Sequence, residues 1–307
     1  MRVTGRTACN QLHRCGMSDR PSFRIIPMLL AIMPTLMLTA LFSAGLGAEA
    51  LRAEITPWAS NEGGRMRLVV MPPEPDGKIR GALQIEPKPG WITYWREPGD
   101  TGIPPKISFS SGSSQGSGVS LGKISFPVPK RIDNGTLRDI GYDKPVAFPF
   151  ELTTDTPDKP AFFNVSAFIG LCRNICIPFE ADFAVAPEPA KGTPVEEAMV
   201  LNAATAALPE PPSDQFTVTH YIMTQGGNVL RLTLRLPEDT LGAPQIIVSG
   251  PEGHVLLDGI NGRREGSSYT LDMPIGKLPK GYEIKGKRWS ILAIAGGRAM
   301  ETSLAFD

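Results

Sequence analysis

The feature that most constrains this chain is a pair of cysteines between two strand-like runs. Cys172 and Cys176 are separated by three residues, the run 163–171 precedes them and the run 175–185 includes and follows the second cysteine. Pro178 disfavours a helix at this point, because proline cannot donate the helical hydrogen bond. A tight turn brings the two Cα atoms within disulfide distance. The pattern therefore predicts a β-hairpin that carries both sulfur atoms at one end.

The first 50 residues have the layout of an export signal. Residues 1–24 contain five arginines and one acidic residue, residues 25–42 form an apolar run without charge, and Ala48-Glu49-Ala50 ends a stretch of small residues. This order is typical of a secretory signal peptide, and Met17 is a possible true start. The alternative is an uncleaved membrane anchor, since the run approaches spanning length. We expect cleavage after Ala50 and a periplasmic location.

Charge and compartment narrow the possible partners. Residues 51–307 carry 26 basic and 29 acidic side chains. This near-neutral balance argues against nucleic acid as a partner, because nucleic-acid sites need an excess of cations. Cys9 and Cys15 lie in the predicted signal, so Cys172 and Cys176 are the cysteines of the exported chain. Outside the cytoplasm such a pair can form a disulfide.

Short β-branched and alternating runs, separated by Gly, Pro and Asn clusters, predict an all-β fold of two sandwiches. We expect a first domain over residues 51–187. A Pro/Ala-rich linker over 188–214 follows, with one short helix at 195–208. A second, smaller β-sandwich is expected over 215–307, where the alternation in 228–236 predicts a half-buried strand. Asn261-Gly262 is a turn signal in that domain.

Three interpretations of the cysteine pair remain open from the residues alone. A structural disulfide that closes the hairpin would stabilise the fold only modestly, because so short a loop removes little entropy from the unfolded chain. Thiolates also bind copper(I), although no histidine lies near the pair in the sequence. The third interpretation is thiol–disulfide exchange, which a short and accessible loop favours.

Three ordered motifs carry a resemblance to a known family. They are Tyr94-Trp-Arg-Glu-Pro-Gly-Asp-Thr-Gly102, then Phe126-Pro-Val-Pro-Lys-Arg131 with Gly141-Tyr-Asp-Lys-Pro-Val146, and finally Cys172-Arg-Asn-Ile-Cys-Ile-Pro-Phe-Glu180. Together they resemble the N-terminal domain of the thiol–disulfide interchange protein DsbD, and most closely its ScsB-like form. The resemblance covers residues 54–185 and, in the ScsB-like form, extends to the second β segment.

The resemblance implies an immunoglobulin-like domain that relays electrons and needs no cofactor. It implies a membrane-embedded thiol reductant as donor and oxidised periplasmic thioredoxin-fold proteins as acceptors. Cys176 would form the mixed disulfide and Cys172 would resolve it. Because the sequence contains no multi-span transporter and no Cys-x-x-C motif, we expect the reductant on a separate polypeptide. The rival hypothesis is a noncatalytic copper-handling or scaffold protein with a structural hairpin disulfide.

Six further residues are candidates for roles around the pair. The resembled domain covers its cysteines with an aromatic cap, and Tyr142 is the aromatic residue that this chain offers in the matching region. Asp143 and Glu180 are candidates for tuning a thiol pKa. Trp95, Arg96 and Asp100 are candidates for partner contact, while Arg96 and Asp100 are also candidates for an ion pair with each other. No metal site is expected.

Overall fold

The computed structural model describes residues 55–111, 119–135, 137–157, 162–187, 195–224, 226–250 and 253–307. The predicted export signal and the stretch 188–194 of the predicted linker lie outside these residues. In the part of the chain that is described, no helix has the length and apolar character needed to cross a membrane. Residues Leu51–Asp307 form one compact unit, so the division into domains at residues 187 and 215 stays a prediction.

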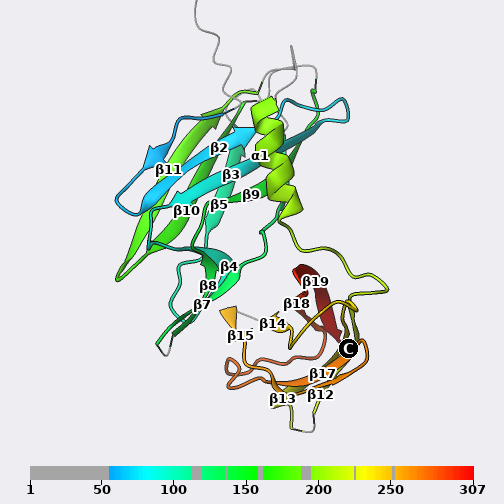
Figure 1. Ribbon diagram of the computed structural model, residues 1–307. Helices are drawn as coiled ribbons and strands as arrows, with labels where there is room; N and C mark the ends of the chain where they lie inside the picture. Colours follow the sequence, from blue (N-terminus) through cyan, green and yellow to red (C-terminus); the bar gives the residue numbers. More distant parts are fainter. Residues whose placement is uncertain are drawn as a thin grey trace, which may run out of the picture. The chain divides into compact units, whose positions relative to one another are not determined.

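The described structure is mostly β, and its sheets are antiparallel (Figure 1). Three sheets are built from residues 59–185. In sheet order, the first comprises β1 (Ala59–Ser60), β2 (Gly64–Val70), β3 (Lys78–Pro87), β9 (Val146–Thr154) and β6 (Val119–Ile124). The second comprises β11 (Cys176–Val185), β10 (Phe163–Cys172) and β5 (Lys106–Ser111). The third comprises β4 (Thr93–Gly99), β8 (Leu137–Tyr142) and β7 (Lys130–Asn134).

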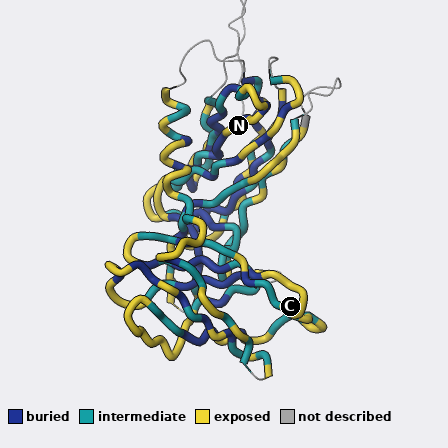
Figure 2. The backbone as a smooth tube through the Cα atoms, turned by 90° about the vertical axis from the view of Figure 1, so that its right-hand side faces the viewer, coloured by how far each residue is buried: buried dark blue, intermediate teal, exposed yellow. Residues whose placement is uncertain are grey.

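Alternation of side chains along β10 explains how this region builds its core. Phe163, Val165, Ala167 and Ile169 are buried, whereas the residues between them are exposed or half-buried. Because side chains two residues apart in a strand share one face, this period buries a single face of the strand. That face joins a cluster with the buried side chains of β2, β3 and β9. The dark-blue segments in Figure 2 follow the strands of this core.

Eight strands form two further sheets from residues 217–306. One sheet has the order β12 (Thr217–Met223), β13 (Val229–Arg235), β17 (Ser268–Pro274) and β16 (Ile260–Glu265). The other has the order β15 (Val255–Leu256), β14 (Gln245–Ser249), β18 (Lys287–Ala295) and β19 (Arg298–Phe306). Leu230, Leu232 and Leu234 of β13 are buried and belong to a second hydrophobic cluster. The half-buried strand predicted over 228–236 is thus confirmed.

The predicted short helix is confirmed as α1 (Val195–Ala206), which ends two residues before the expected position. It packs against β2, β3 and β9 (Figure 1). The amide of Val128 donates to the carbonyl of Ala207 at 2.9 Å, which fastens the end of the helix to the loop before β7. Leu201 and Ala204 are its buried side chains.

The turn predicted at Asn261-Gly262 is wrong. Both residues lie inside β16, where the pairing with β17 shifts register between Ile260 and Arg263. Asn261 has a φ of 55°, a value that turns share with bulges. Its side-chain amide donates to Asp272 at 3.1 Å, so a contact with the neighbouring strand accompanies the irregularity.

Candidate redox site at the end of β10 and β11

Cys172 and Cys176 face each other where the β10–β11 pair ends. Cys172 is the last residue of β10, Cys176 is the first residue of β11, and the two are register partners with a Cα–Cα distance of 4.1 Å. Their sulfur atoms form a disulfide. The expected hairpin with both cysteines at one end is therefore present, closed by a turn of three residues.

The two cysteines differ in exposure. Cys172 is buried, with 5 % of its surface exposed, whereas Cys176 is an exposed residue at the edge of the turn. An incoming thiolate must reach a sulfur atom along the line of the disulfide bond, so access decides which sulfur is attacked. In this site Cys176 is the more accessible of the two bonded cysteines.

Cys172 lies between two neighbours, its register partner Cys176 in β11 and Ile92. On one side it pairs with β11. On the other, the amide of Ile92 donates to the carbonyl of Cys172 at 2.8 Å, and the amide of Cys172 donates to the carbonyl of Ile92 at 3.0 Å. Because Ile92 directly precedes β4, this bridge joins the disulfide to the strand that carries Tyr94.

The hydroxyl of Tyr94 lies 3.6 Å from the sulfur of Cys176. A disulfide sulfur carries no hydrogen, so the phenol is the donor in this contact. Burial, with a smaller contribution from the charge of Asp139, raises the pKa of Tyr94 above its ordinary value. The phenol therefore stays protonated around neutral pH and can donate to a sulfur that becomes negatively charged.

Two glycines fix the position of the Tyr94 ring. A Cβ atom added to Gly102 would lie 2.4 Å from Cδ1 of Tyr94, and one added to Gly170 would lie 3.3 Å from Cδ2. The ring thus lies between the loop after β4 and the strand that ends at Cys172. Any larger residue at position 102 would displace the phenol, because real Cβ atoms do not approach so closely.

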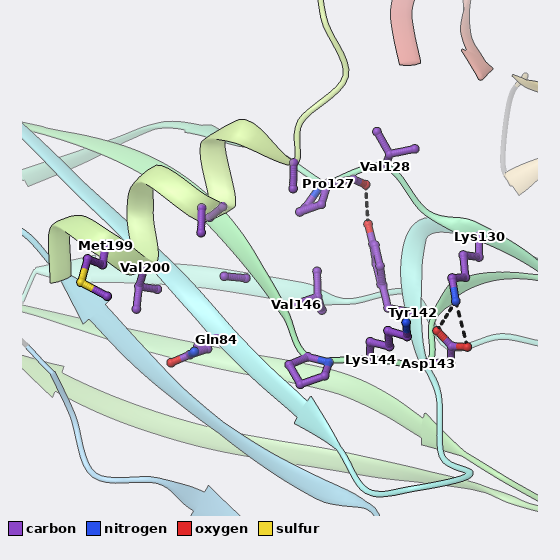
Figure 3. Close-up of a pocket in the computed structure, with 15 residues that line it drawn as sticks. Gln84, Pro127, Val128, Lys130, Tyr142, Asp143, Lys144, Val146, Met199 and Val200 are labelled. Atoms are coloured by element: carbon purple, nitrogen blue, oxygen red, sulfur yellow. Dashed lines mark hydrogen bonds and ion pairs between the residues drawn. The ribbon is translucent and has the colours of Figure 1, made fainter. Parts of the chain in front are cut away.

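Tyr142, the predicted cap, is buried away from solvent. Its hydroxyl donates to the carbonyl of Pro127 at 2.7 Å, and its ring packs against Phe148 at 5.5 Å between centroids. Figure 3 shows the hydroxyl directed at Pro127, beside a pocket that α1 borders. The structure brings Tyr94 to the sulfur instead. This placement argues against the shielding role of Tyr142.

The two carboxylates predicted to tune a thiol also have other surroundings. Asp143 pairs with Lys130 at 2.8 Å (Figure 3), and this hydrogen bond lowers the pKa of Asp143. Glu180 is exposed on β11, four residues and therefore about 13 Å along the strand from Cys176. Neither placement supports direct proton exchange with a sulfur atom in this conformation.

Among the predicted partner contacts, Trp95 is buried, with 1 % of its surface exposed. Arg96 covers its ring at 4.0 Å and forms an ion pair with Glu301 of β19. Asp100 pairs with Arg138 at 3.1 Å, which lowers the pKa of Asp100. Arg96 and Asp100 therefore have separate partners, and the predicted pair between them is wrong. Burial argues against Trp95 as a partner contact.

Tyr94 is a functional candidate that appears in the sequence only as part of a motif, with no expected role of its own. The signal that points to it is the spacing of glycines around it. Gly102 stands eight residues after Tyr94, and Gly170 stands two residues before Cys172. Glycines on both sides of an aromatic ring indicate that the ring is packed tightly. That Gly102 and Gly170 both lie against the ring of Tyr94 is visible only in the folded structure.

No cluster of three or more His, Cys, Asp and Glu side chains placed to bind a metal ion occurs among the residues that the structure describes. The candidate site comprises the disulfide, the phenol of Tyr94 and the turn between the cysteines.

Comparisons with known proteins identify a matching family and a similar fold. Residues 67–187 match the family described as thiol:disulfide interchange protein DsbD, N-terminal. The fold is similar to the crystal structure of the N-terminal periplasmic domain of ScsB from Proteus mirabilis, with a TM-score of 0.65 and 23 % sequence identity. That match covers 83 % of this chain and 99 % of the ScsB chain. No curated protein matches the sequence. The segment that matches the family of DsbD N-terminal domains contains both cysteines and Tyr94.

Proposed function

We propose that this protein is a thiol–disulfide oxidoreductase that relays two electrons through Cys172 and Cys176. The observation that carries the proposal is the asymmetry of the disulfide: Cys176 is exposed, while Cys172 is 5 % exposed. An exposed sulfur bonded to a sheltered one gives an incoming thiol a single point of attack. The match of residues 67–187 to the DsbD N-terminal family supports the same chemistry.

In the accepting step, a thiolate of the donor attacks the sulfur of Cys176. The Cys172–Cys176 bond breaks, and its electron pair leaves on the sulfur of Cys172. The second cysteine of the donor then attacks the sulfur of the donor's first cysteine in the mixed disulfide, and Cys176 leaves as a thiolate. The donor leaves as a disulfide, and the pair holds two electrons and takes up protons according to its pKa values.

In the delivering step, the thiolate of Cys176 attacks a disulfide of the acceptor, and one acceptor sulfur leaves as a thiolate. The thiol of Cys172 then loses its proton and attacks Cys176. This second attack re-forms the Cys172–Cys176 bond and releases the reduced acceptor. The short distance between the two cysteines, 4.1 Å between Cα atoms, favours the intramolecular attack.

The phenol of Tyr94 stabilises the thiolate of Cys176 in this scheme. A hydrogen bond to the charged form of a group favours that form, so the phenol lowers the pKa of the thiol. Because the pKa of Tyr94 is itself raised by burial, the phenol remains a donor at the pH at which the thiolate forms.

The wider functional setting follows from the family resemblance. The donor is a membrane-embedded thiol reductant on a separate chain, and the acceptors are periplasmic proteins of the thioredoxin fold. Roles in cytochrome c maturation, in copper tolerance and in redox homeostasis fit such a relay. The export signal predicted over residues 1–50 supports a periplasmic location. The proposed redox domain is an immunoglobulin-like sandwich, followed by a proposed second β-sandwich domain.

The alternatives are a structural disulfide and a copper-handling protein. The exposure of Cys176 is a specific observation against the first, because a structural disulfide gains nothing from an accessible sulfur. For the second, no observation among the described residues favours copper over exchange.

Trapping of mixed disulfides tests the proposal. In chains whose Cys9 and Cys15 are replaced by serine, Cys172→Ser should accumulate mixed disulfides with periplasmic proteins, because the resolving sulfur is missing. Cys176→Ser should accumulate few. Mass spectrometry of the trapped species identifies the partners. Equal trapping by the two variants, or trapping by neither, would contradict the proposed relay.

A further inference from the structure

The turn between the cysteines exposes three side chains beside the reactive sulfur. Arg173, Asn174 and Ile175 are all exposed, and the amide of Arg173 donates to the carbonyl of Ile175 at 3.1 Å. This hydrogen bond keeps the turn compact. Any protein thiol that reaches Cys176 therefore passes next to these side chains.

Ile175 is an apolar residue that the fold leaves in solvent. Its exposed fraction is 69 %, and it precedes Cys176 directly. A single exposed apolar side chain needs no explanation by itself. Its position directly before the exposed residue Cys176 is informative, because an apolar contact at that point is buried only while a partner is docked.

Arg173 supplies, at the same turn, a positive charge that has no ion-pair partner among the residues the structure describes. Its guanidinium lies against Gly90, where an added Cβ would be 3.5 Å from Nε of Arg173. Arg173 forms no ion pair with any residue in the described ranges, whereas Arg96, Arg131 and Arg138 each pair with a carboxylate. An exposed cation without an ion-pair partner in the described ranges is suited to a carboxylate from another molecule.

We infer that the turn residues Arg173 and Ile175 select the exchange partner. The partner they fit is a protein thiol or disulfide whose reactive cysteine is flanked by an apolar side chain and a carboxylate. The inference rests on the proposed function, because docking matters only if Cys176 exchanges. The partner makes the apolar contact with Ile175 and the ion pair with Arg173 while its sulfur atom approaches Cys176 along the line of the Cys172–Cys176 bond.

Peptide thiols of defined sequence test the charge preference. The probes are acetyl-Leu-Cys-Glu-amide and acetyl-Leu-Cys-Lys-amide, and the measured quantity is the rate of reduction of the Cys172–Cys176 disulfide per peptide thiolate at low salt. The acidic peptide should react about 3-fold faster, the size expected of one exposed ion pair. High salt should remove this difference, because it screens exposed charges.

Charge reversal at the turn gives the sharper result. Arg173→Glu should reverse the preference, so that the basic peptide reacts faster. Arg263→Glu is the matched control: Arg263 is exposed on β16, away from the cysteine hairpin in the sheet order, and the change in net charge is the same. This control should keep the preference of the unaltered protein. Retention of the acidic preference in Arg173→Glu would overturn the inference.

The apolar contact has its own test. Ile175→Ser should remove the advantage of acetyl-Leu-Cys-Glu-amide over acetyl-Ser-Cys-Glu-amide, whereas Ile222→Ser, an exposed isoleucine of β12, should preserve it. Equal rates for these peptides in the unaltered protein would overturn this part of the inference while the exchange proposal stands. If no peptide thiol reduces the disulfide, the proposed function itself fails.

Discussion

Two long hairpins in this protein end in different ways. The β10–β11 pair matches ten residue pairs, from Phe163↔Val185 to Cys172↔Cys176, and closes with the disulfide. The β18–β19 pair matches nine, from Lys287↔Phe306 to Ala295↔Arg298. It closes through Gly296 and Gly297, whose φ values of 59° and 77° suit a tight hairpin turn.

The comparison separates hairpin formation from disulfide chemistry. The β18–β19 pair reaches a similar length without a cross-link, so long antiparallel pairing in this protein does not depend on one. In a chain-entropy estimate, a disulfide across so short a loop contributes about 2 kcal/mol to the free energy of unfolding. The disulfide therefore contributes less to stability than the buried faces of the strands.

The largest expected effect concerns the core of the glycine-closed hairpin. Trp289 of β18 is 1 % exposed and donates to the hydroxyl of Tyr282 at 3.0 Å. Trp289→Ala should lower the free energy of unfolding by about 3–5 kcal/mol, because it leaves a large cavity. Urea unfolding measures this loss. If Trp289→Ala lowers the free energy of unfolding by less than removal of the disulfide does, the claim that the buried strand faces contribute more than the disulfide is contradicted.

Removal of the disulfide should have the next largest effect. Replacing Cys172 and Cys176 by alanine together should lower the free energy of unfolding by about 2 kcal/mol. The variant should keep the far-ultraviolet circular dichroism of the unaltered protein. Failure of this variant to fold would show that β10–β11, unlike β18–β19, needs its cross-link, and the disulfide would then be structural.

Loss of one hydroxyl should alter the chemistry of Cys176 but not the fold. In the reduced protein, Tyr94→Phe should raise the pKa of the Cys176 thiol by about one unit, equivalent to about 1.4 kcal/mol, because the thiolate loses a donor. The pH profile of alkylation by iodoacetamide reports this pKa. Tyr221→Phe is the control, since its hydroxyl donates to Ala305 in the second β region. An unchanged profile in Tyr94→Phe would remove Tyr94 from the site.

The smallest effect is expected at the exposed pair of Asp143 and Lys130. Hydrogen bonding to Lys130 lowers the pKa of Asp143, so its contribution is present above the pKa of the unfolded chain and is lost as the pH falls through the lower folded value. At pH 7, Asp143→Asn should cost less than about 1 kcal/mol of unfolding free energy. The difference from the unaltered protein should vanish in acid. A change in exchange rate would restore Asp143 as a tuning residue.

Strand patterns and the cysteine hairpin could be predicted from the sequence because they depend on local alternation. Residues 228–236 alternate in the sequence and in the structure, and Pro178 correctly excluded a helix. Contacts between distant segments could not be predicted in this way. The partner of Arg96 is Glu301, 205 residues away, and the phenol of Tyr94 meets a sulfur 82 residues away.

Residue type alone misplaced several site candidates for the same reason. Tyr142 and Tyr94 are both aromatic residues in motifs of the family, and nothing local distinguishes them. The fold directs Tyr142 at Pro127 and Tyr94 at Cys176. The closeness of Gly102 to the Tyr94 ring is likewise a property of the assembled fold.

The central claim is that partner thiols enter and leave through the sulfur of Cys176. The most direct test compares the two single-cysteine variants, Cys172→Ser and Cys176→Ser, with Cys9 and Cys15 also replaced by serine. Stopped-flow reaction with Ellman's reagent measures the rate of each remaining thiol. The account predicts that Cys176 reacts at least about tenfold faster in the folded protein, and that the two rates converge in denaturant. Equal rates in the folded state, or a faster Cys172, would contradict it.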